Sequence, residues 1–351
     1  MYSLSKKYLD SLSFSRDQLS ALRTIGEYQG KQKLFFKQSP EILKGLQLAA
    51  VIESSESSNR LEGITAPYHR IAELITHNTA PKGRSEQEIA GYRDALNLIH
   101  QSSEHMPFSL NVILQLHSWL YRYLPHPGGH WKKTDNEITE IHPDGGKRVR
   151  FVPSTAFETP LAMESLVQGY DMSIRQWNVE PLVAIPAAIL DFLCIHPFLD
   201  GNGRTARLLT LLLLYRFDYQ VGRYISLERI FEESKETYYE TLEKSSQKWH
   251  HGEHDLIPWM TYFWGVLLRA YKDFEARVGT LADGKGNKAH HVRITVDNMT
   301  GPFSISDIER ACLSVSRDTI RLVLRQLRDE DFIVSEGKGR SAKWVKNLDK
   351  R

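Results

Sequence analysis

Two apolar runs of helical length dominate the hydrophobic pattern of the chain. They cover residues 181–195 and 208–215, and both are too short and too interrupted to cross a membrane. The stretch between them is mostly polar and contains three glycine and asparagine residues in a row, at 201–203. The pattern therefore predicts a loop that leaves one buried helix and leads directly into another.

Apolar residues at three- and four-residue steps predict further helices at 86–99, 110–124 and 161–177. Another such helix starts at Ser39-Pro40-Glu41, where a capping residue is followed by a proline and an acid, and it stops near Gly63. Residues 1–38 are polar with scattered aromatics, and we expect them to form an N-terminal arm or short helices.

The stretch 125–160 is rich in Gly, Pro, His and Asn and is the longest weakly structured part of the chain. Within it, residues 147–153 alternate in strand fashion after the turn Asp144-Gly145-Gly146, which predicts a β-hairpin.

The polar run at 279–289 predicts a linker to a second domain at 290–351. This domain combines a helix at 303–311, a helix capped by Ser316 and a hairpin at 334–345 around residues 337–340, which is typical of a winged helix. The predicted fold is therefore mainly α: a helical bundle with a β-hairpin, followed by a small winged-helix domain.

Composition indicates a soluble protein of two or more domains. The 351 residues include 45 Lys or Arg and 43 Asp or Glu, so no global basic field calls for nucleic acid. The two cysteines, Cys194 and Cys312, lie far apart in apolar helical contexts, as expected of free thiols in a reducing compartment. The first residues lack the apolar core of a secretory signal. We expect a cytoplasmic protein with no membrane segment.

The loop between the two apolar runs carries the candidate chemistry. Gly201-Asn202-Gly203 falls at a helix start, where free backbone N–H groups and the positive helix end favour an anion. Arg204 and Arg207 are three apart, so both are predicted to project from one helix face and to grip phosphate oxygens. Asp200 offers a hard oxygen ligand for Mg²⁺, and His196 is the base that is neutral near pH 7.

Taken singly, each of these residues has an ordinary explanation, such as a structural histidine, a turn or a solvated helix face. Together they resemble the signature of the Fic family, His-x-Phe-x-Asp/Glu-Gly-Asn-Gly-Arg-x-x-Arg. The matching residues are His196, Phe198, Asp200, Gly201, Asn202, Gly203, Arg204 and Arg207.

This resemblance implies transfer of AMP from ATP, with Mg²⁺, to a hydroxyl group of a target protein and of the chain itself. It implies His196 as catalytic base, Phe198 as an anchor of the loop and Asp200 as the metal ligand. The nucleotide-binding residues that it implies are Asp200, Gly201, Asn202, Gly203, Arg204, Thr205, Arg207 and Tyr239.

Two further stretches resemble the family. Ser58 and Glu62, one turn apart, match its inhibitory motif Ser/Thr-x-x-x-Glu-Gly/Asn, although an ordinary helix end has the same appearance. The hairpin matches the flap, here residues Arg148, Val149, Arg150 and Phe151, which holds a target segment beside the histidine by main-chain pairing. A plain surface hairpin is the alternative.

The predicted domains are an N-terminal arm (1–38), a Fic catalytic domain (39–278) with its inhibitory helix at about 40–63, a linker (279–289) and a winged helix (290–351). The winged helix carries 12 Lys or Arg against 9 Asp or Glu, so DNA and a protein remain equal alternatives as its partner. The sequence leaves open whether the chain forms a homodimer.

Three function classes follow from these observations. The first is an adenylyltransferase restrained by Glu62. The second is a hydrolase that removes AMP from proteins at the same site. The third is a nucleotide-sensing regulator that binds DNA.

Overall fold

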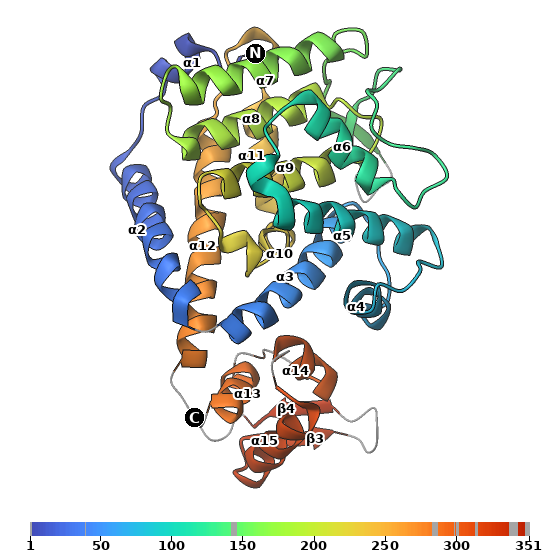
Figure 1. The fold of residues 1–351 in the computed structure, drawn as a ribbon, viewed down its shortest axis with the longest axis vertical. Coiled ribbons are helices and arrows are strands. Elements are labelled where there is room, and N and C mark those ends of the chain that lie inside the picture. The colour runs from blue at the N-terminus through green and yellow to red at the C-terminus, as the bar shows by residue number, and fades with distance from the viewer. Residues whose placement is uncertain are drawn as a thin grey trace. The chain divides into compact units, whose positions relative to one another are not determined.

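The computed structural model (Figure 1) divides into two compact units, Met1–Gln32 with Ala50–Tyr271 and Lys33–Ala49 with Lys272–Arg351. Three helices run across the division: α2 (Arg16–Gln38), α3 (Pro40–Leu61) and α12 (Ile257–Ala282). The predicted boundaries at residues 39 and 279 therefore differ from this division, because continuous helices span both regions. The structure describes residues 2–38, 40–141, 146–282, 287–297, 299, 302–312, 315–336 and 343–347.

The first unit is built almost entirely from helices, and the predicted mainly α fold is confirmed. Its hydrophobic centre is the pair formed by α8 and α9, against which α7, α5 and α6 pack. The remaining helices of this unit are α1 (Lys6–Ser11), α4 (Tyr68–Thr76), α5 (Arg84–Ser102), α6 (Leu110–Leu120), α7 (Thr159–Arg175), α8 (Pro181–Ile195), α9 (Asn202–Arg216), α10 (Leu227–Glu233) and α11 (Lys235–Ser246), with short 3₁₀ turns at Ser103–His105, Val221–Arg223 and Trp249–His251.

Helix α8 contains a proline, and the fold compensates for it. Pro186 has no N–H group, so the carbonyl of Leu182, four residues earlier, loses its helical partner. The indole N–H of Trp264 donates to this carbonyl at 2.8 Å, and the indole of Trp259 donates to the Pro186 carbonyl at 2.9 Å. Both tryptophans come from α12, which thereby holds α8 in place.

The N-terminal residues differ from the expected arm or short helices. Helix α2 is 23 residues long, and Leu4 and Ile25 are buried. The side-chain amides of Gln29 and Gln32 donate to the carbonyls of Phe217 and Asp218, just beyond the end of α9. Because these glutamines satisfy backbone acceptors, a polar sequence can form a packed helix here.

The predicted hairpin is present. Strands β1 (Ile138–Ile141) and β2 (Lys147–Phe151) pair antiparallel, with an irregularity between Ile138 and Thr139. Residues 144 and 145 of the predicted turn lie outside the described part of the chain.

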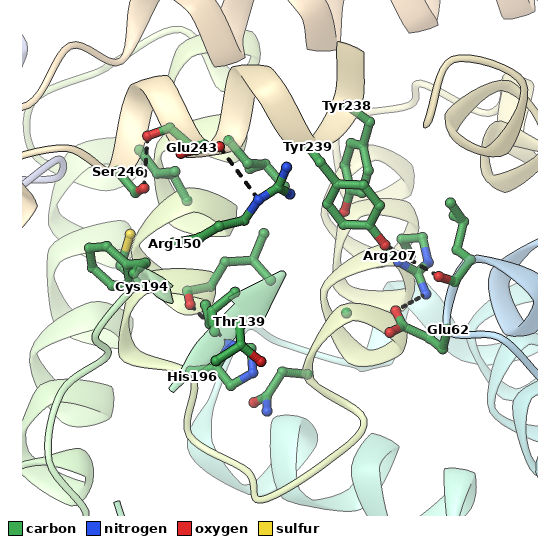
Figure 2. Close-up of a pocket in the computed structure, with 18 of the residues that line it drawn as sticks. Glu62, Thr139, Arg150, Cys194, His196, Arg207, Tyr238, Tyr239, Glu243 and Ser246 are labelled. Carbon is green, nitrogen blue, oxygen red and sulfur yellow. Dashed lines mark hydrogen bonds and ion pairs between the residues drawn. The ribbon is translucent and has the colours of Figure 1, made fainter. Parts of the chain in front are cut away.

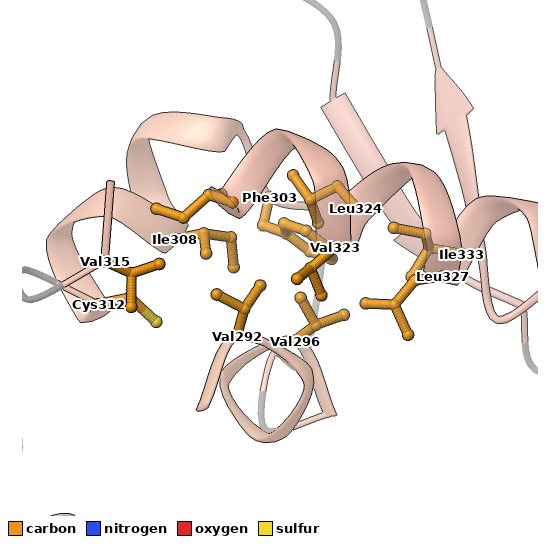
Figure 3. Close-up of a cluster of buried hydrophobic side chains, with 11 residues drawn as sticks. Val292, Val296, Phe303, Ile308, Cys312, Val315, Val323, Leu324, Leu327 and Ile333 are labelled. Atoms are coloured by element: carbon orange, nitrogen blue, oxygen red, sulfur yellow. The ribbon is translucent and has the colours of Figure 1, made fainter. Parts of the chain in front are cut away.

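The second unit contains helices α13 (Asn287–Asp297), α14 (Ile305–Ala311) and α15 (Arg317–Asp329), followed by the antiparallel strands β3 (Ile333–Glu336) and β4 (Lys343–Lys346). Ser316 caps α15 as predicted, since its side chain accepts from the Thr319 N–H. The apolar faces of the three helices enclose a core of their own (Figure 3). The hairpin tip at 337–340 lies outside the described residues, and the winged-helix assignment stays a prediction.

The predicted linker is largely helical where the structure describes it. Residues 279–282 continue α12 and residues 287–289 begin α13, while residues 283–286 lie outside the described part. Polar composition alone did not distinguish a linker from the ends of two helices. Both cysteines are buried and free, as expected. In the described residues, no helix combines the length and apolar character needed to cross a membrane.

Candidate active site

A sharp turn at the end of α8 brings His196 out of the core. His196 adopts a left-handed conformation, with φ 51° and ψ 60°, while its N–H still donates to the Phe192 carbonyl at 2.9 Å. This conformation is uncommon for a residue other than glycine and is typical of functional sites. Gly201, with φ 82°, makes the second turn and starts α9.

The loop between these turns is held by hydrogen bonds on both sides. The Phe198 N–H donates to the Asn202 side chain at 2.9 Å, and the Asn202 amide donates back to the Phe198 carbonyl at 2.7 Å. From outside, the Lys132 ammonium donates to the Ile195 carbonyl at 3.2 Å, and the Asn136 amide to the Phe198 carbonyl at 3.0 Å. Sequence reasoning missed Lys132 and Asn136, because nothing in the weakly structured stretch distinguishes them.

A cavity of about 830 Å³ opens beside the loop (Figure 2). It lies between the end of α3, the hairpin, the loop and the polar face of α11. The structure brings most of the predicted site residues together at its wall: Glu62, Arg150, Phe151, His196, Asp200, Gly201, Asn202, Gly203, Arg207 and Tyr239.

The two signature arginines do not both line the cavity, although their spacing predicted that they project from one helix face. Arg204 does not line the cavity; its side chain is 1% exposed and donates to Glu88 of α5 at 2.7 Å. Arg207 instead lines the cavity and points toward α3. Thr205 also lies away from the cavity wall, because its hydroxyl donates to the Gly201 carbonyl at 2.9 Å.

The remaining predicted residues lie around the cavity rather than in its wall. Ser58 is buried behind it, and Val149 is exposed on the hairpin. Arg148 pairs with Glu243 of α11. Arg150, which does line the cavity, lies 3.5 Å from Glu243, and its guanidinium is 5.8 Å from the ring centroid of Tyr239. The hairpin is thus joined to α11 through charged side chains.

The predicted contact between the end of α3 and Arg207 is present. The Arg207 guanidinium donates to the Glu62 carboxylate at 2.7 Å and to the Ser58 hydroxyl and carbonyl, each at 2.8 Å. Gly203 faces the same carboxylate, and a Cβ atom there would collide with the Glu62 oxygen. Glu62 therefore pairs with Arg207 in the wall of the cavity.

The imidazole of His196 is neutral near pH 7. Burial lowers the pKa of His196 to about 4, against the raising effect of the Leu193 carbonyl and of nearby carboxylates. The contact of 3.2 Å between Nδ1 and the Leu193 carbonyl requires the proton to be on Nδ1. Nε2 is then left unprotonated and able to accept a proton.

Asp200 is suited to hold Mg²⁺ together with a nucleotide. Its side chain is 63% exposed and lines the cavity. Burial alone would raise its pKa, but the Arg204 charge, the Tyr121 hydroxyl and the Gly201 N–H outweigh burial and lower the pKa. Among the described residues no group of three His, Cys, Asp or Glu could hold a metal on its own. A single ionised carboxylate fits a Mg²⁺ ion whose other ligands are phosphates and water.

Comparison with known proteins agrees with this geometry. Residues 107–214 match the model of the Fic/DOC family. The chain contains a Fic domain. This domain begins shortly before α6 and ends within α9, so it includes the whole loop from His196 to Gly203.

The curated relatives are proteins named protein adenylyltransferase Fic. The protein from Drosophila ananassae is 27% identical over 222 residues, and the one from Drosophila melanogaster is 26% identical over 225 residues. In both cases the match covers 62% of this chain and 40% of the relative, so the chain spans less than half the length of these relatives.

Solved structures show the same fold. A Fic family protein from Desulfovibrio desulfuricans has a TM-score of 0.61 at 19% identity, and the match covers 97% of this chain and 98% of that one. A Fic-domain signalling protein from Bacteroides thetaiotaomicron has a TM-score of 0.60 at 23% identity, covering 73% of this chain and 98% of its own.

Proposed function

We propose that this protein transfers AMP from ATP to a serine, threonine or tyrosine hydroxyl of a target protein, and to itself. The observation that carries the proposal is the position of His196. Its neutral imidazole lies in the wall of the same cavity as the start of α9 and Arg207. The adenylyltransferase names of the relatives support this reaction class.

In this reaction His196 Nε2 accepts the proton of the target hydroxyl. The hydroxyl oxygen bonds to the α-phosphorus of ATP, and the bond from that phosphorus to the bridging oxygen breaks, so that pyrophosphate leaves. The N–H groups at the start of α9 and the Arg207 guanidinium stabilise the phosphate charge. Asp200 would hold Mg²⁺, which supplies further neutralisation of the phosphates when bound. Arg150 and Tyr239 line the part of the cavity that remains for the adenine of ATP. The hairpin strands offer backbone groups to the target.

We further propose that Glu62 restrains the enzyme. The negative carboxylate pairs with the guanidinium that would bind the outer phosphate, so ATP would enter with its tail displaced. Attack requires the oxygen, the phosphorus and the leaving group to be in line, and a small displacement slows the reaction.

Removal of AMP from a modified protein is the second candidate activity. The Glu62 side chain is 33% exposed and lines the same cavity as His196, so it could orient a water molecule toward an AMP-protein bond.

Mass spectrometry after incubation with ATP and Mg²⁺ tests the proposal. We expect the protein, or a protein in a lysate, to gain the mass of AMP less water at a hydroxyl residue. Release of AMP from a modified protein without any transfer would favour the hydrolase. Binding of ATP with neither reaction would favour a nucleotide sensor.

A further inference from the structure

The C-terminal end of α6 contacts the loop between α8 and α9 through two side chains that lie one helical turn apart. His117 Nε2 is 3.0 Å from the Asp200 carbonyl oxygen, and the Tyr121 hydroxyl donates to the Asp200 carboxylate at 2.9 Å. Both rings also pack against Gly201, where a Cβ atom would lie 3.3 Å from the Tyr121 ring and 3.4 Å from His117 Nε2. One helix end therefore holds the backbone and the side chain of the same residue.

The His117 contact has a defined direction. The Gly129 N–H donates to His117 Nδ1 at 2.9 Å, so Nδ1 is the acceptor and the ring proton lies on Nε2. Nε2 therefore donates to the Asp200 carbonyl. The same ring stacks on Phe198, with centroids 3.7 Å apart and planes inclined by 1°. His117 fixes the backbone of the loop and is a structural histidine whose two ring nitrogens both have partners.

The Tyr121 contact acts on the carboxylate itself. Oδ1 of Asp200 accepts from the Gly201 N–H at 2.7 Å, and Oδ2 accepts from Tyr121. Two donors on different oxygens fix both side-chain torsions of a residue that is otherwise largely exposed. Oδ2 also lies 3.5 Å from the Arg204 guanidinium, so Oδ1 is the oxygen that retains a second lone pair for another partner.

We propose that Tyr121 is a positioning residue that holds the Asp200 carboxylate ready for a divalent cation bound to a nucleoside triphosphate. The inference rests on the nucleotide binding assumed in the proposed function. Without the Tyr121 hydroxyl, the carboxylate keeps its charge but must be ordered when the cation binds. Such outer contacts of metal ligands typically contribute about 10- to 100-fold in metal affinity.

The chain offers a matched control two residues away. The Tyr123 hydroxyl donates to the Asp94 carboxylate at 2.8 Å, and neither residue lines the cavity. Tyr121→Phe and Tyr123→Phe each remove one tyrosine–aspartate hydrogen bond beyond the end of the same helix. Both substitutions keep the ring, so the packing of Tyr121 against His117 is retained, with ring centroids 4.6 Å apart.

The experiment measures ATP affinity by titration calorimetry on the full chain, with Mn²⁺ and with no divalent cation, and follows bound Mn²⁺ by electron paramagnetic resonance. We expect Tyr121→Phe to reduce the gain in ATP affinity from Mn²⁺ about tenfold. Affinity without the cation stays as in the wild type, and Tyr123→Phe behaves as wild type throughout. In an Asp200→Asn background, Tyr121→Phe should have no further effect, because the two residues act as one unit.

Three results would overturn the inference: an unchanged Mn²⁺-dependent gain in Tyr121→Phe, equal losses in the two tyrosine variants, or a loss that persists in the Asp200→Asn background. If the expected binding pattern appears but no AMP adduct forms, the proposed transfer reaction fails and the role of Tyr121 stands. A wild-type chain that gains no affinity from Mn²⁺ would overturn the role of Tyr121 directly.

Discussion

Two walls of the cavity each carry an arginine side chain close to a glutamate, and the two arginines differ in solvent exposure (Figure 2). On the α3–α9 wall, the guanidinium of Arg207 is 2% exposed and pairs with Glu62. On the hairpin–α11 wall, Arg150 is 22% exposed and approaches Glu243, which also pairs with Arg148, 55% exposed, outside the cavity.

The two walls differ in how far the arginine side chains are exposed to solvent. Exposed ion pairs typically contribute about 0–1 kcal/mol, because water competes for both partners. A guanidinium removed from water depends strongly on its partner, since it has few alternatives. We therefore expect the α3–α9 wall to control the reaction rate and the hairpin–α11 wall to adjust binding.

The largest effect is expected at the loop between the two walls. His196→Ala should reduce AMP transfer by about 10²–10⁴-fold, because proton removal from the hydroxyl is lost. ATP binding should persist, since the start of α9 and Arg207 remain. Adduct formation by mass spectrometry and ATP binding by calorimetry check the two parts. Transfer at the wild-type rate would show that His196 is not the base of the reaction.

Removing the carboxylate from the α3–α9 wall should have the next largest effect. Glu62→Gly should speed AMP transfer by about 10²-fold, because Arg207 becomes available and the α-phosphorus can come into line. The measurement is adduct formation at equal protein and ATP concentrations.

Glu62→Gln is the matched control for charge. It keeps the size of the side chain and removes its negative charge, so it should also activate. Activation by glycine alone would indicate that bulk or helix ending, rather than charge, restrains the site. No activation by either variant would end the autoinhibition argument.

The pH profile of kcat/KM tests whether His196 is as strongly desolvated as the structure indicates. A depressed pKa means that the neutral, base-competent form is present above pH 4 and is lost as pH falls through about 4. The contribution of His196 should therefore be nearly constant between pH 7 and pH 5. An exposed histidine of ordinary pKa would lose about 25-fold over the same interval. Such a loss would show that His196 is exposed to solvent and has an ordinary pKa.

The smallest effect is expected on the hairpin–α11 wall. Glu243→Gln removes the charge that faces Arg148 and Arg150, and we expect KM for ATP to change by no more than about threefold, with kcat unchanged. Steady-state kinetics in the Glu62→Gly background provides the measurement. An effect as large as that of Glu62 would remove the distinction between the two walls.

The features that could be predicted from the sequence are those that depend on neighbouring residues. Periodicity predicted α5 to α9, the strand alternation predicted the hairpin, and the cap at Ser316 marked the start of α15. Helical geometry also placed Ser58 and Glu62 on one face, and both contact Arg207. These features follow from local backbone geometry, which a short stretch of residues is enough to specify.

Contacts between distant groups could not be predicted from the sequence, because they depend on the tertiary fold. Spacing placed Arg204 and Arg207 on one face, yet Arg204 is buried against Glu88 of α5 and only Arg207 lines the cavity. Tyr121 carries no motif, although its position one turn after His117 was visible. Partners such as these are far apart in the chain, and their contacts depend on how whole helices pack. A periodic pattern shows which face of a helix is buried, whereas the neighbour that covers that face determines what each polar side chain does.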